Sequence, residues 1–384
     1  MKDLLQCRQD IDSIDNQILK LLASRMEVAR DIAQYKLEHN QGITDSIREL
    51  AKLKSLREKA SKLGLPGDCI TDIYRQIMSH TCAVEQHYII ATVNNIDIKR
   101  DTSVAFLGDK GSYSFLAARE YLSGYKGELK MLGCPTFENI VSLVETGRVN
   151  YGVLPIENSS SGSINEVLDV LQNTKASFVG ELYLNIDHSI LASQKVALSE
   201  ITDVYSHPQP FAQCSEWIKD HLPHAKVHYC KATSEAMQKI ADESNPQHVA
   251  IGSHMAAQVY NLIPLADNIA NNIHNYTRFV IISMTPISIP ETLPSKTSLS
   301  FSVQKYTPGS LIAVLNEFSK AQINLTKLVS RPRLIPGRDT WEEIFFVDLE
   351  SNVSSEKMQE ILENLHQYTG SLKVLGCYVN AEKK

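Results

Sequence analysis

One apolar stripe near the start of the chain constrains the fold more than any other feature. Apolar side chains recur every third or fourth residue from Leu4 to Tyr35, which is the spacing of one helical face. Arg25 is the only charged member of this stripe. A cation on a packed face is costly without an anion beside it, so we expect an anionic partner there. Arg8 and Lys36 lie beside the stripe, and three cations along one helix favour binding of a small molecule with several negative charges.

A simpler interpretation of Arg25 is a solvated side chain, or one half of an ion pair with another helix. The stripe itself predicts a helix from about 4 to 39, roughly 50 Å long at about 1.5 Å per residue. Shorter helices are predicted over about 45–63 and after Pro66 and Gly67. Two shorter helices cannot cover so long a stripe, so we expect a partner chain to complete an intertwined dimer.

Composition limits the class of protein. A chain of 384 residues exceeds one ordinary core, so two or three domains are expected. The net charge of −6 and the absence of a basic patch argue against nucleic-acid binding. Seven scattered cysteines without a CxxC pair indicate reduced thiols rather than disulfides or a metal site. The sequence shows neither a secretion signal nor an apolar run long enough to span a membrane, so a cytoplasmic location is expected.

The chain divides into regions with different patterns. Residues 1–92 are predicted to be helical, and the polar residues 93–102 form a linker. From 103 to 284, short apolar runs such as VAFLG, YGVLPI and HVAIGS alternate with helical stretches, as at 115–122 and 138–145. This alternation predicts an α/β region with mainly parallel strands, long enough for two lobes.

A proline-containing linker spans 285–296, and another pattern follows it over 297–380. The runs SLSFSV, IFFVDLE and LKVLGCY have the composition of strands, while 308–320 and 354–368 are predicted helices. A βαββαβ order fits this spacing and predicts a small ferredoxin-like α+β domain. The whole chain is therefore expected to be multidomain, with all-α, α/β and α+β parts.

Polar loops follow several predicted strands of the α/β region. They are GDKGSYS at 108–114, the ENSSSG run at 157–162, VYSHPQPFAQC at 204–214 and NYTRF at 275–279. Ligands bind at such strand ends, and hydroxyls and amides there can bind carboxylates. Taken singly, these residues are as well explained by turns and helix caps: Ser163 or Asn165 could cap a helix, and His207 could be a loop residue. The phosphate-loop and G-x-S-x-G patterns are absent, which argues against a P-loop enzyme and a serine hydrolase.

The three regions, in this order, resemble the bifunctional P-protein family of phenylalanine biosynthesis. The runs LPIENSSSG, SHPQPFAQC, YTRF and VLGCY carry the resemblance. It implies a chorismate mutase, a two-lobed, periplasmic-binding-like prephenate dehydratase and an ACT regulatory domain. It also implies chorismate and prephenate as substrates, phenylalanine as an allosteric inhibitor, a homodimer or higher homo-oligomer, and neither a cofactor nor a metal.

In the mutase, the resemblance implies a site made of cations and hydrogen-bonding groups, with Arg8 reaching into the partner chain's site. The implied substrate-binding residues are Arg8, Arg25, Lys36, Asp45, Arg48, Glu49, Thr81 and Glu85. Arg25, Lys36 and Glu85 would be catalytic, while Asp45 also suits a helix N-cap. The rearrangement of chorismate is pericyclic, so it needs confinement and cations at the oxygen that gains negative charge, not a nucleophile.

Glu85 departs from a common form of the family, in which Ser and Gln stand where Thr81 and Glu85 stand here. Glutamine donates a hydrogen bond at any pH, whereas glutamate donates only when protonated. We therefore expect mutase activity to fall as pH rises, unless burial keeps Glu85 neutral. A second alignment, which uses Cys82 and Gln86 instead, is ranked lower.

In the dehydratase, the resemblance implies that Thr277 donates a proton to the departing hydroxide. The implied substrate-binding residues are Glu157, Asn158, Ser159, Ser160, Ser206, Gln213, Thr277 and Arg278. Arg278 would bind a carboxylate or brace the cleft. The run GDKGSYS departs from the family's GPxGTFS at Asp109, Ser112 and Tyr113, and these changes look tolerable.

In the C-terminal region, the resemblance implies effector binding by a helix start, where free amides suit an amino-acid carboxylate. The implied residues are Gly309, Ser310, Leu311, Ile312, Ser330, Arg331 and Pro332. Val329 replaces the glutamate that the family usually has there, so weaker phenylalanine inhibition is expected. Two rival hypotheses are an amino-acid sensor without catalysis, and an enzyme with one activity whose helical part only dimerises.

Overall fold

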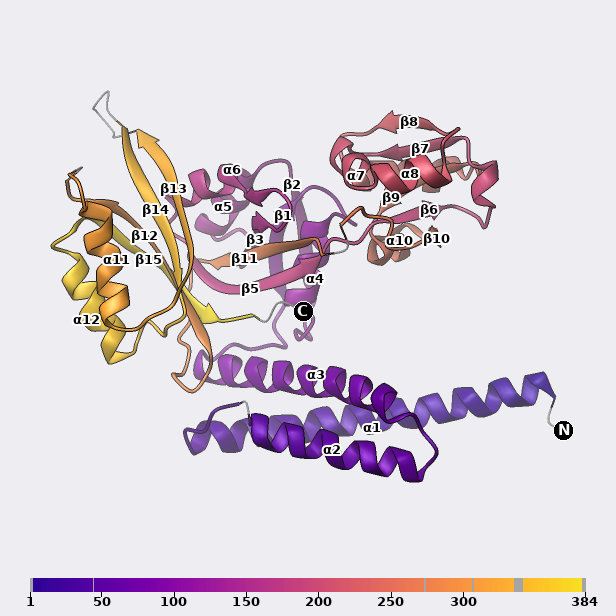
Figure 1. Ribbon diagram of the computed structural model, residues 1–384, viewed down its shortest axis with the longest axis horizontal. Helices are drawn as coiled ribbons and strands as arrows, with labels where there is room; N and C mark the ends of the chain where they lie inside the picture. Colours follow the sequence, from indigo (N-terminus) through magenta and orange to yellow (C-terminus); the bar gives the residue numbers. More distant parts are fainter. Residues whose placement is uncertain (1–2, 44, 273, 306, 335–340, 382–384) are drawn as a thin grey trace. The chain divides into compact units, whose positions relative to one another are not determined.

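The computed structural model describes residues 3–43, 45–272, 274–305, 307–334 and 341–381 (Figure 1). The chain forms two compact units, Met1–Ile98 with Ser288–Leu293, and Lys99–Ile287 with Pro294–Lys384. Within these described ranges, no helix is both long and apolar enough to cross a membrane.

The first unit consists of three helices, as the sequence predicts. They are α1 (Leu4–Glu38), α2 (Ser46–Lys62) and α3 (Gly67–Val93). Asp45 is the N-cap of α2, and its carboxylate accepts a hydrogen bond from the backbone N–H of Arg48 at 2.9 Å. The capping interpretation of Asp45 is therefore confirmed. Helix α3 packs against both α1 and α2.

Much of the apolar stripe on α1 is exposed in the single chain. Ala29 and Ala33 are buried, but Ile14 and Leu21 are 55% and 70% exposed. The other exposed large apolar side chains of this helix are Leu4, Leu5, Ile11, Ile18, Leu19, Val28 and Tyr35. Such a contiguous exposed apolar surface is unusual on a monomeric protein and marks an interaction surface.

Part of the predicted second linker, residues 288–293, packs against the helical unit. Asn94, the residue that follows α3, donates a side-chain hydrogen bond to the carbonyl oxygen of Ser288 at 2.9 Å. Its side-chain oxygen accepts from the N–H of Ser288 at 2.7 Å. Ile289 and Leu293 are buried, so the segment 288–293 is packed rather than free.

The second unit begins with a sheet in the order β2-β1-β3-β11-β5, with β4 paired to β3. The strands are β1 (Thr102–Leu107), β2 (Leu129–Cys134), β3 (Tyr151–Asn158), β4 (Gly162–Ser163), β5 (Ser177–Asn185) and β11 (Tyr276–Ser283). The helices beside them are α4 (Tyr113–Tyr121), α5 (Phe137–Glu145) and α6 (Asn165–Leu171). Two apolar clusters hold these helices to the sheet, one including α4 and the other α5 and α6.

A second sheet in the order β10-β6-β9-β7-β8 forms the other lobe. Its strands are β6 (Ser189–Ala192), β7 (Asp203–Ser206), β8 (Lys226–Tyr229), β9 (His248–Gly252) and β10 (Ile263–Ala266). Its helices are α7 (Pro208–Gln213), α8 (Ser215–His221), α9 (Thr233–Glu243), α10 (His254–Tyr260) and a short 3-10 turn at Leu198–Glu200.

The expectation of mainly parallel strands is wrong. Parallel pairing joins β1 to β2 and β3, and β7 to β8 and β9. Strand β11 runs antiparallel to β3 and β5, and β6 runs antiparallel to β9 and β10. The reason is the path of the chain, which enters the second lobe after β5 and returns to the first sheet in β11 from the opposite direction.

The C-terminal part has the predicted βαββαβ order. Its elements are β12 (Ser295–Val303), α11 (Ser310–Lys320), β13 (Leu325–Leu334), β14 (Trp341–Leu349), α12 (Glu356–Leu365) and β15 (Thr369–Val379). The sheet order β13-β14-β12-β15 is antiparallel throughout. One face carries α11 and α12, while residues of β14 and β15 on the other share a core with the first sheet. At Gly376 an added Cβ would lie 2.2 Å from the carbonyl oxygen of Phe178, so β15 approaches β5 closely.

Candidate active sites

Asn158 and Thr277 meet where β3 and β11 pair. They are partners in the strand register, and both are buried. The side-chain oxygen of Asn158 accepts from the backbone N–H groups of Ser160 and Ser161 at 2.9 and 3.1 Å. Its Nδ2 therefore faces Thr277 and donates to Oγ1 at 3.0 Å. Because Thr277 Oγ1 accepts this bond, its own hydrogen stays available to a third group.

The serines of the ENSSSG run hold the turn against β11. The hydroxyl of Ser159 accepts from the N–H of Tyr276 at 2.9 Å and donates to the carbonyl of His274 at 3.1 Å. The turn interpretation of this run is confirmed. The alternative that Ser163 or Asn165 caps the next helix does not hold, because the N-cap of α6 is Ile164, which makes no side-chain capping bond.

Ser206 and Gln213 lie in the second lobe and make bonds of their own. Ser206 is fully buried, and its hydroxyl donates to the carbonyl of Ile251 at 3.1 Å. Gln213 contacts the ring of His188 at 2.8 Å. The neighbouring His207 is an N-cap, since its ring accepts from the N–H of Gln209 at 3.2 Å.

Sequence reasoning missed His188, which lies where the chain crosses from β5 to β6. Its other ring nitrogen is 3.1 Å from the hydroxyl of Tyr113, which donates to the carbonyl of Asp187 at 2.7 Å. Burial lowers the pKa of His188, which favours the neutral ring. In the neutral ring Nε2 donates to Oε1 of Gln213, and Nδ1 is then the unprotonated nitrogen that faces the hydroxyl of Tyr113. A lone histidine in the apolar run LNIDHSILA was the available signal.

Arg278 is engaged by carboxylates of its own chain. Its guanidinium lies 2.7 Å from Glu181 and 2.5 Å from Asp348, and it donates to the hydroxyl of Tyr378 at 3.0 Å. Lys296 completes the cluster at 2.6 Å from Glu181. Burial alone would raise the pKa of Asp348, but Arg278 and its other partners hold it below its ordinary value.

One further predicted residue, Glu157, borders this cluster. Glu157 is 2.9 Å from Lys327 and 3.9 Å from Arg278. The guanidinium of Arg278 is thus surrounded by acidic side chains. Of the two roles expected for Arg278, this geometry suits bracing better than binding of a substrate carboxylate.

In the helical unit, Lys36 and Glu85 form an ion pair. Lys36 Nζ lies 2.8 Å from Glu85 Oε2 and donates to the carbonyl of Ile43 at 2.7 Å. Glu85 and Thr81 are buried on the same side of α3, and the hydroxyl of Thr81 donates to the carbonyl of Ile77 at 2.7 Å. An ammonium has three donors, so one of Lys36 remains for a ligand.

Arg25 is half-buried, and its Nε is a buried donor without a hydrogen-bond partner among the described residues. Buried donors are normally satisfied, so this one suits an acceptor from outside the chain. Arg8, Asp45 and Arg48 are exposed and Glu49 is half-buried. The single chain therefore joins Lys36 to Glu85. The guanidinium groups of Arg8 and Arg48 have no hydrogen-bond or ion-pair partner among the residues that the structure describes.

The predicted effector loop borders a cavity of about 330 Å³ at the start of α11. Gly309 has φ of +89° as the N-cap, and α11 has no side-chain capping bond. The lining is Gln304, Lys305, Thr307, Pro308, Gly309, Ser310, Ala313, Gln367 and Tyr368. Leu311 is half-buried and Ile312 is exposed.

The other predicted effector residues lie on β13. Ser330 and Pro332 are exposed, while Val329 packs against the core shared with the first sheet. Arg331 binds Asp169 of α6 through two hydrogen bonds of 2.8 and 2.6 Å. The guanidinium of Arg331 is thus already paired with a carboxylate of the chain.

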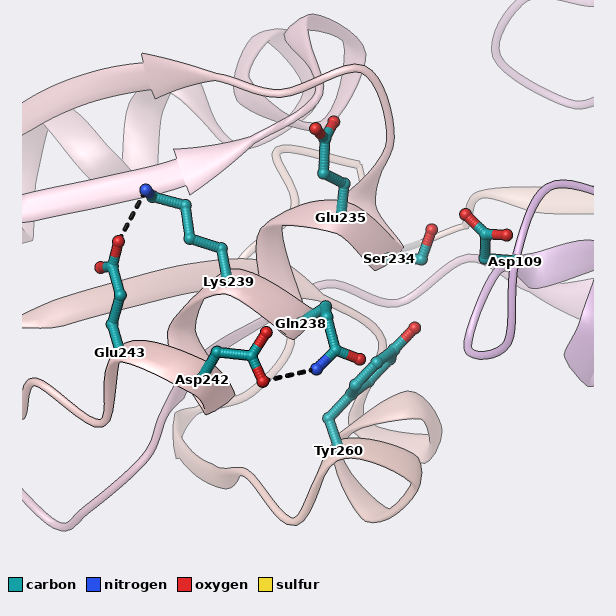
Figure 2. A pocket seen from close by; sticks show the side chains of 8 residues that line it. All are labelled: Asp109, Ser234, Glu235, Gln238, Lys239, Asp242, Glu243 and Tyr260. Atoms are coloured by element: carbon teal, nitrogen blue, oxygen red, sulfur yellow. Dashed lines mark hydrogen bonds and ion pairs between the residues drawn. The ribbon is translucent and has the colours of Figure 1, made fainter.

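A second cavity, of about 500 Å³, lies between α9, Tyr260 of α10 and the loop after β1, and Figure 2 shows the side chains that line it. Lys239 pairs with Glu243 at 2.6 Å, and Gln238 donates to Asp242 at 2.8 Å. The full lining is Asp109, Ser234, Glu235, Gln238, Lys239, Asp242, Glu243 and Tyr260, which includes none of the predicted substrate-binding residues. Tyr260 also donates to the carbonyl of Lys110, across the two lobes.

Comparison with known proteins gives two family matches. The family described as chorismate mutase type II matches residues 7–86, and the family described as prephenate dehydratase matches residues 104–286. A bifunctional chorismate mutase/prephenate dehydratase of Enterobacter agglomerans is 40% identical over 375 residues, covering 98% of this chain and 95% of that protein. The chain belongs to the bifunctional chorismate mutase/prephenate dehydratase family.

Other similar proteins support the same family assignment. The bifunctional chorismate mutase/prephenate dehydratase of Escherichia coli strain K12 is 39% identical over 375 residues, 98% of this chain and 96% of that protein. Among solved structures, a prephenate dehydratase of Arthrobacter aurescens in complex with L-Phe has a TM-score of 0.65 and 25% identity. That match covers 73% of this chain and 91% of the other.

Several features of this family member were not predicted from its sequence. The buried cluster around Arg278 also contains Glu181, Lys296 and Asp348, three charged residues within strands. A charge inside an apolar run, as in SFVGELYL and IFFVDLE, was the signal for it.

Among the residues that the structure describes, no group of three or more His, Cys, Asp or Glu side chains is placed to hold a metal.

Proposed function

We propose that this chain rearranges chorismate to prephenate in its helical unit and converts prephenate to phenylpyruvate in the two-lobed region. Phenylalanine, bound by the C-terminal domain, acts as the feedback inhibitor. We assign residues 1–92 to the mutase, 103–284 to the dehydratase and 297–380 to an ACT domain. The observation that carries the proposal is the hydrogen bond from Asn158 to Thr277, which frees the threonine hydrogen for proton donation.

For the mutase, the side chains supply fixed charge and shape. The rearrangement breaks the ether C–O bond and forms a C–C bond in one step, while negative charge builds on the ether oxygen. Lys36 keeps one free donor, and Arg25 has a buried, unpartnered Nε among the described atoms. Donors already in place where charge develops stabilise the transition state without reorganisation.

We propose that a second copy of the chain covers the exposed face of α1. The contiguous apolar side chains there have the composition of an interface core rather than a solvated face. Arg8 is exposed on the same helix, so a second α1 packed against this face brings Arg8 near a site in the other chain. The active assembly is then at least a homodimer.

For the dehydratase, Thr277 acts as the proton donor. The carboxylate on the ring of prephenate leaves as carbon dioxide, and the electrons of the broken C–C bond form a ring double bond. The ring hydroxyl leaves with its C–O electrons and takes a proton, which gives water. Asn158 holds Thr277 Oγ1 in place for this transfer, and solvent later restores the proton.

For regulation, we propose that phenylalanine binds at the start of α11. The first turn of this helix has no side-chain cap, and its backbone amides suit a carboxylate. Gly309 adopts the left-handed conformation that turns the chain into the helix. The cavity of about 330 Å³ at this position is large enough for an amino acid.

Separate assays with chorismate and with prephenate test the proposal. Purified protein should consume chorismate, and it should form phenylpyruvate from prephenate supplied alone. A protein that only binds amino acids turns over neither compound. An enzyme whose helices only dimerise turns over prephenate but not chorismate, so the pair of assays distinguishes both rivals from the proposal.

A further inference from the structure

The buried cluster around Arg278 joins the C-terminal domain to the strand that carries Thr277. Arg278 and Glu181 belong to β11 and β5 of the first sheet, whereas Lys296, Asp348 and Tyr378 belong to β12, β14 and β15. All five residues are less than 8% exposed. Ser298 of β12 adds a hydrogen bond to Asp348 at 2.5 Å. The charges of the two cations and the two carboxylates balance, so the cluster is complete without an outside anion.

Arg278 also lies beside an irregular point in the pairing of β11 with β3. The pairing of β11 with β3 shifts between Arg278 and Phe279: Thr277 pairs with Asn158 and Arg278 with Glu157, but Phe279 pairs with Pro155. Ile156 of β3 is therefore the extra, unpaired residue, and such a bulge bends the strand and changes the direction of the side chains beside it. The direction of Thr277 therefore depends on how the backbone is held at Arg278.

We propose that Asp348 and Tyr378 of the C-terminal domain are positioning residues of the dehydratase. They hold the guanidinium of Arg278, which fixes β11 against the bulge in β3 and so aims the hydroxyl of Thr277. Neither residue touches the substrate. The inference rests on the proposed dehydratase function and makes the C-terminal domain a structural part of that site, in addition to its regulatory role.

Asp348→Asn tests this in the full-length protein, because it removes the charge and keeps the size of the side chain. A misplacement of about 1 Å costs about 10²-fold in rate, so kcat for prephenate should fall about 10- to 100-fold. KM for prephenate should stay within about twofold, because Arg278 binds no substrate group. Mutase activity of the same sample should be unchanged.

Asp169→Asn is the matched control. Asp169 also bridges the first lobe and the C-terminal domain through Arg331, but it lies on α6 rather than beside Thr277. Its dehydratase kcat should match that of the unaltered protein. A general weakening of the interface would instead lower kcat in both variants, and that result overturns the positioning role.

Tyr378→Phe provides a second variant should Asp348→Asn unfold below the assay temperature. It removes the hydroxyl that accepts from Arg278 and leaves every charge of the cluster in place. We expect kcat to fall about 3- to 10-fold, as loss of one hydrogen bond of about 1 kcal/mol implies. Adding Thr277→Ser to Asp348→Asn or to Tyr378→Phe should lower kcat by a smaller factor than Thr277→Ser does in the unaltered protein, because the hydroxyl is already misaligned.

The outcomes separate the two claims. Unchanged kcat in a folded Asp348→Asn protein overturns the positioning role alone. If Asp348→Asn is unfolded, unchanged kcat in Tyr378→Phe overturns it. A raised KM with unchanged kcat also overturns it, since Arg278 would then be a substrate ligand. Absence of prephenate turnover in the unaltered protein overturns the proposed function, and the positioning role with it.

Discussion

Lys36 and Glu85 form a partly shielded ion pair between α1 and α3, with 2.8 Å between Nζ and Oε2. The two residues lie 49 positions apart in the sequence, and only the packing of the helices brings them together. The pair places Glu85 at the cationic site of the proposed mutase. Cys82 and Gln86, the other aligned pair, are half-buried instead.

Glu85→Gln should flatten the pH profile of the mutase. Glutamate donates a hydrogen bond only when protonated, so kcat/KM for chorismate should fall as pH rises in the unaltered protein. Glutamine donates at every pH, and the variant should show little change. Initial rates of chorismate loss over a pH series measure this, with Gln86→Ala as the control that keeps the original profile. The same pH dependence in both proteins would refute the role of Glu85.

Arg25→Met should separate binding from stability. Loss of a hydrogen bond to a charged group costs about 1.5–3 kcal/mol, so kcat/KM for chorismate should fall at least about 10- to 100-fold. The free energy of unfolding should not fall, because the variant no longer buries an unpartnered donor. Arg30→Met, at an exposed position of the same helix, should leave both quantities unchanged. Marked destabilisation with normal activity would show that Arg25 is a structural residue.

His188→Gln should change how stability depends on pH. Burial lowers the pKa of His188 in the folded protein, so the unfolded chain binds a proton more readily. The stability that the neutral ring contributes is therefore present above the unfolded pKa of about 6.5 and is lost as pH falls below it.

Urea unfolding between pH 7.5 and 5.5 measures this effect. The unaltered protein should lose more stability over that interval than His188→Gln does. His221→Gln, at an exposed position, should behave as the unaltered protein does. Equal losses in all three proteins would show that His188 is not held neutral in the fold.

Phenylalanine should inhibit the dehydratase weakly. Val329 stands where the related motif has an acidic residue, and its side chain packs into an apolar core. Prephenate turnover should fall only at phenylalanine concentrations well above the low micromolar range. A titration of initial rate against phenylalanine measures this, and half-maximal inhibition at low micromolar phenylalanine would contradict it.

The sequence predicted the features that depend on local patterns. The three helices follow from a spacing of three and four residues, and the βαββαβ order follows from short alternating runs. Local patterns placed Asn158 and Thr277 in polar runs beside predicted strands, and the family resemblance implied their roles; the structure joins the two residues by a hydrogen bond.

Features that depend on distant pairing were not predicted. Arg278 meets Glu181 and Asp348 across 97 and 70 residues of sequence, and no local pattern specifies such a pair. The antiparallel direction of β11 depends on the return of the chain from the second lobe. His188 is fixed by Tyr113 and Gln213, which lie far from it in the sequence.

The most direct test follows chorismate in the unaltered protein and in Thr277→Ala side by side. The unaltered protein should consume chorismate and release phenylpyruvate. The Thr277→Ala protein should consume chorismate at the same initial rate and accumulate prephenate without phenylpyruvate. Phenylpyruvate formation by Thr277→Ala at the unaltered rate, or no loss of chorismate in either protein, would contradict two activities carried by these residues in one chain.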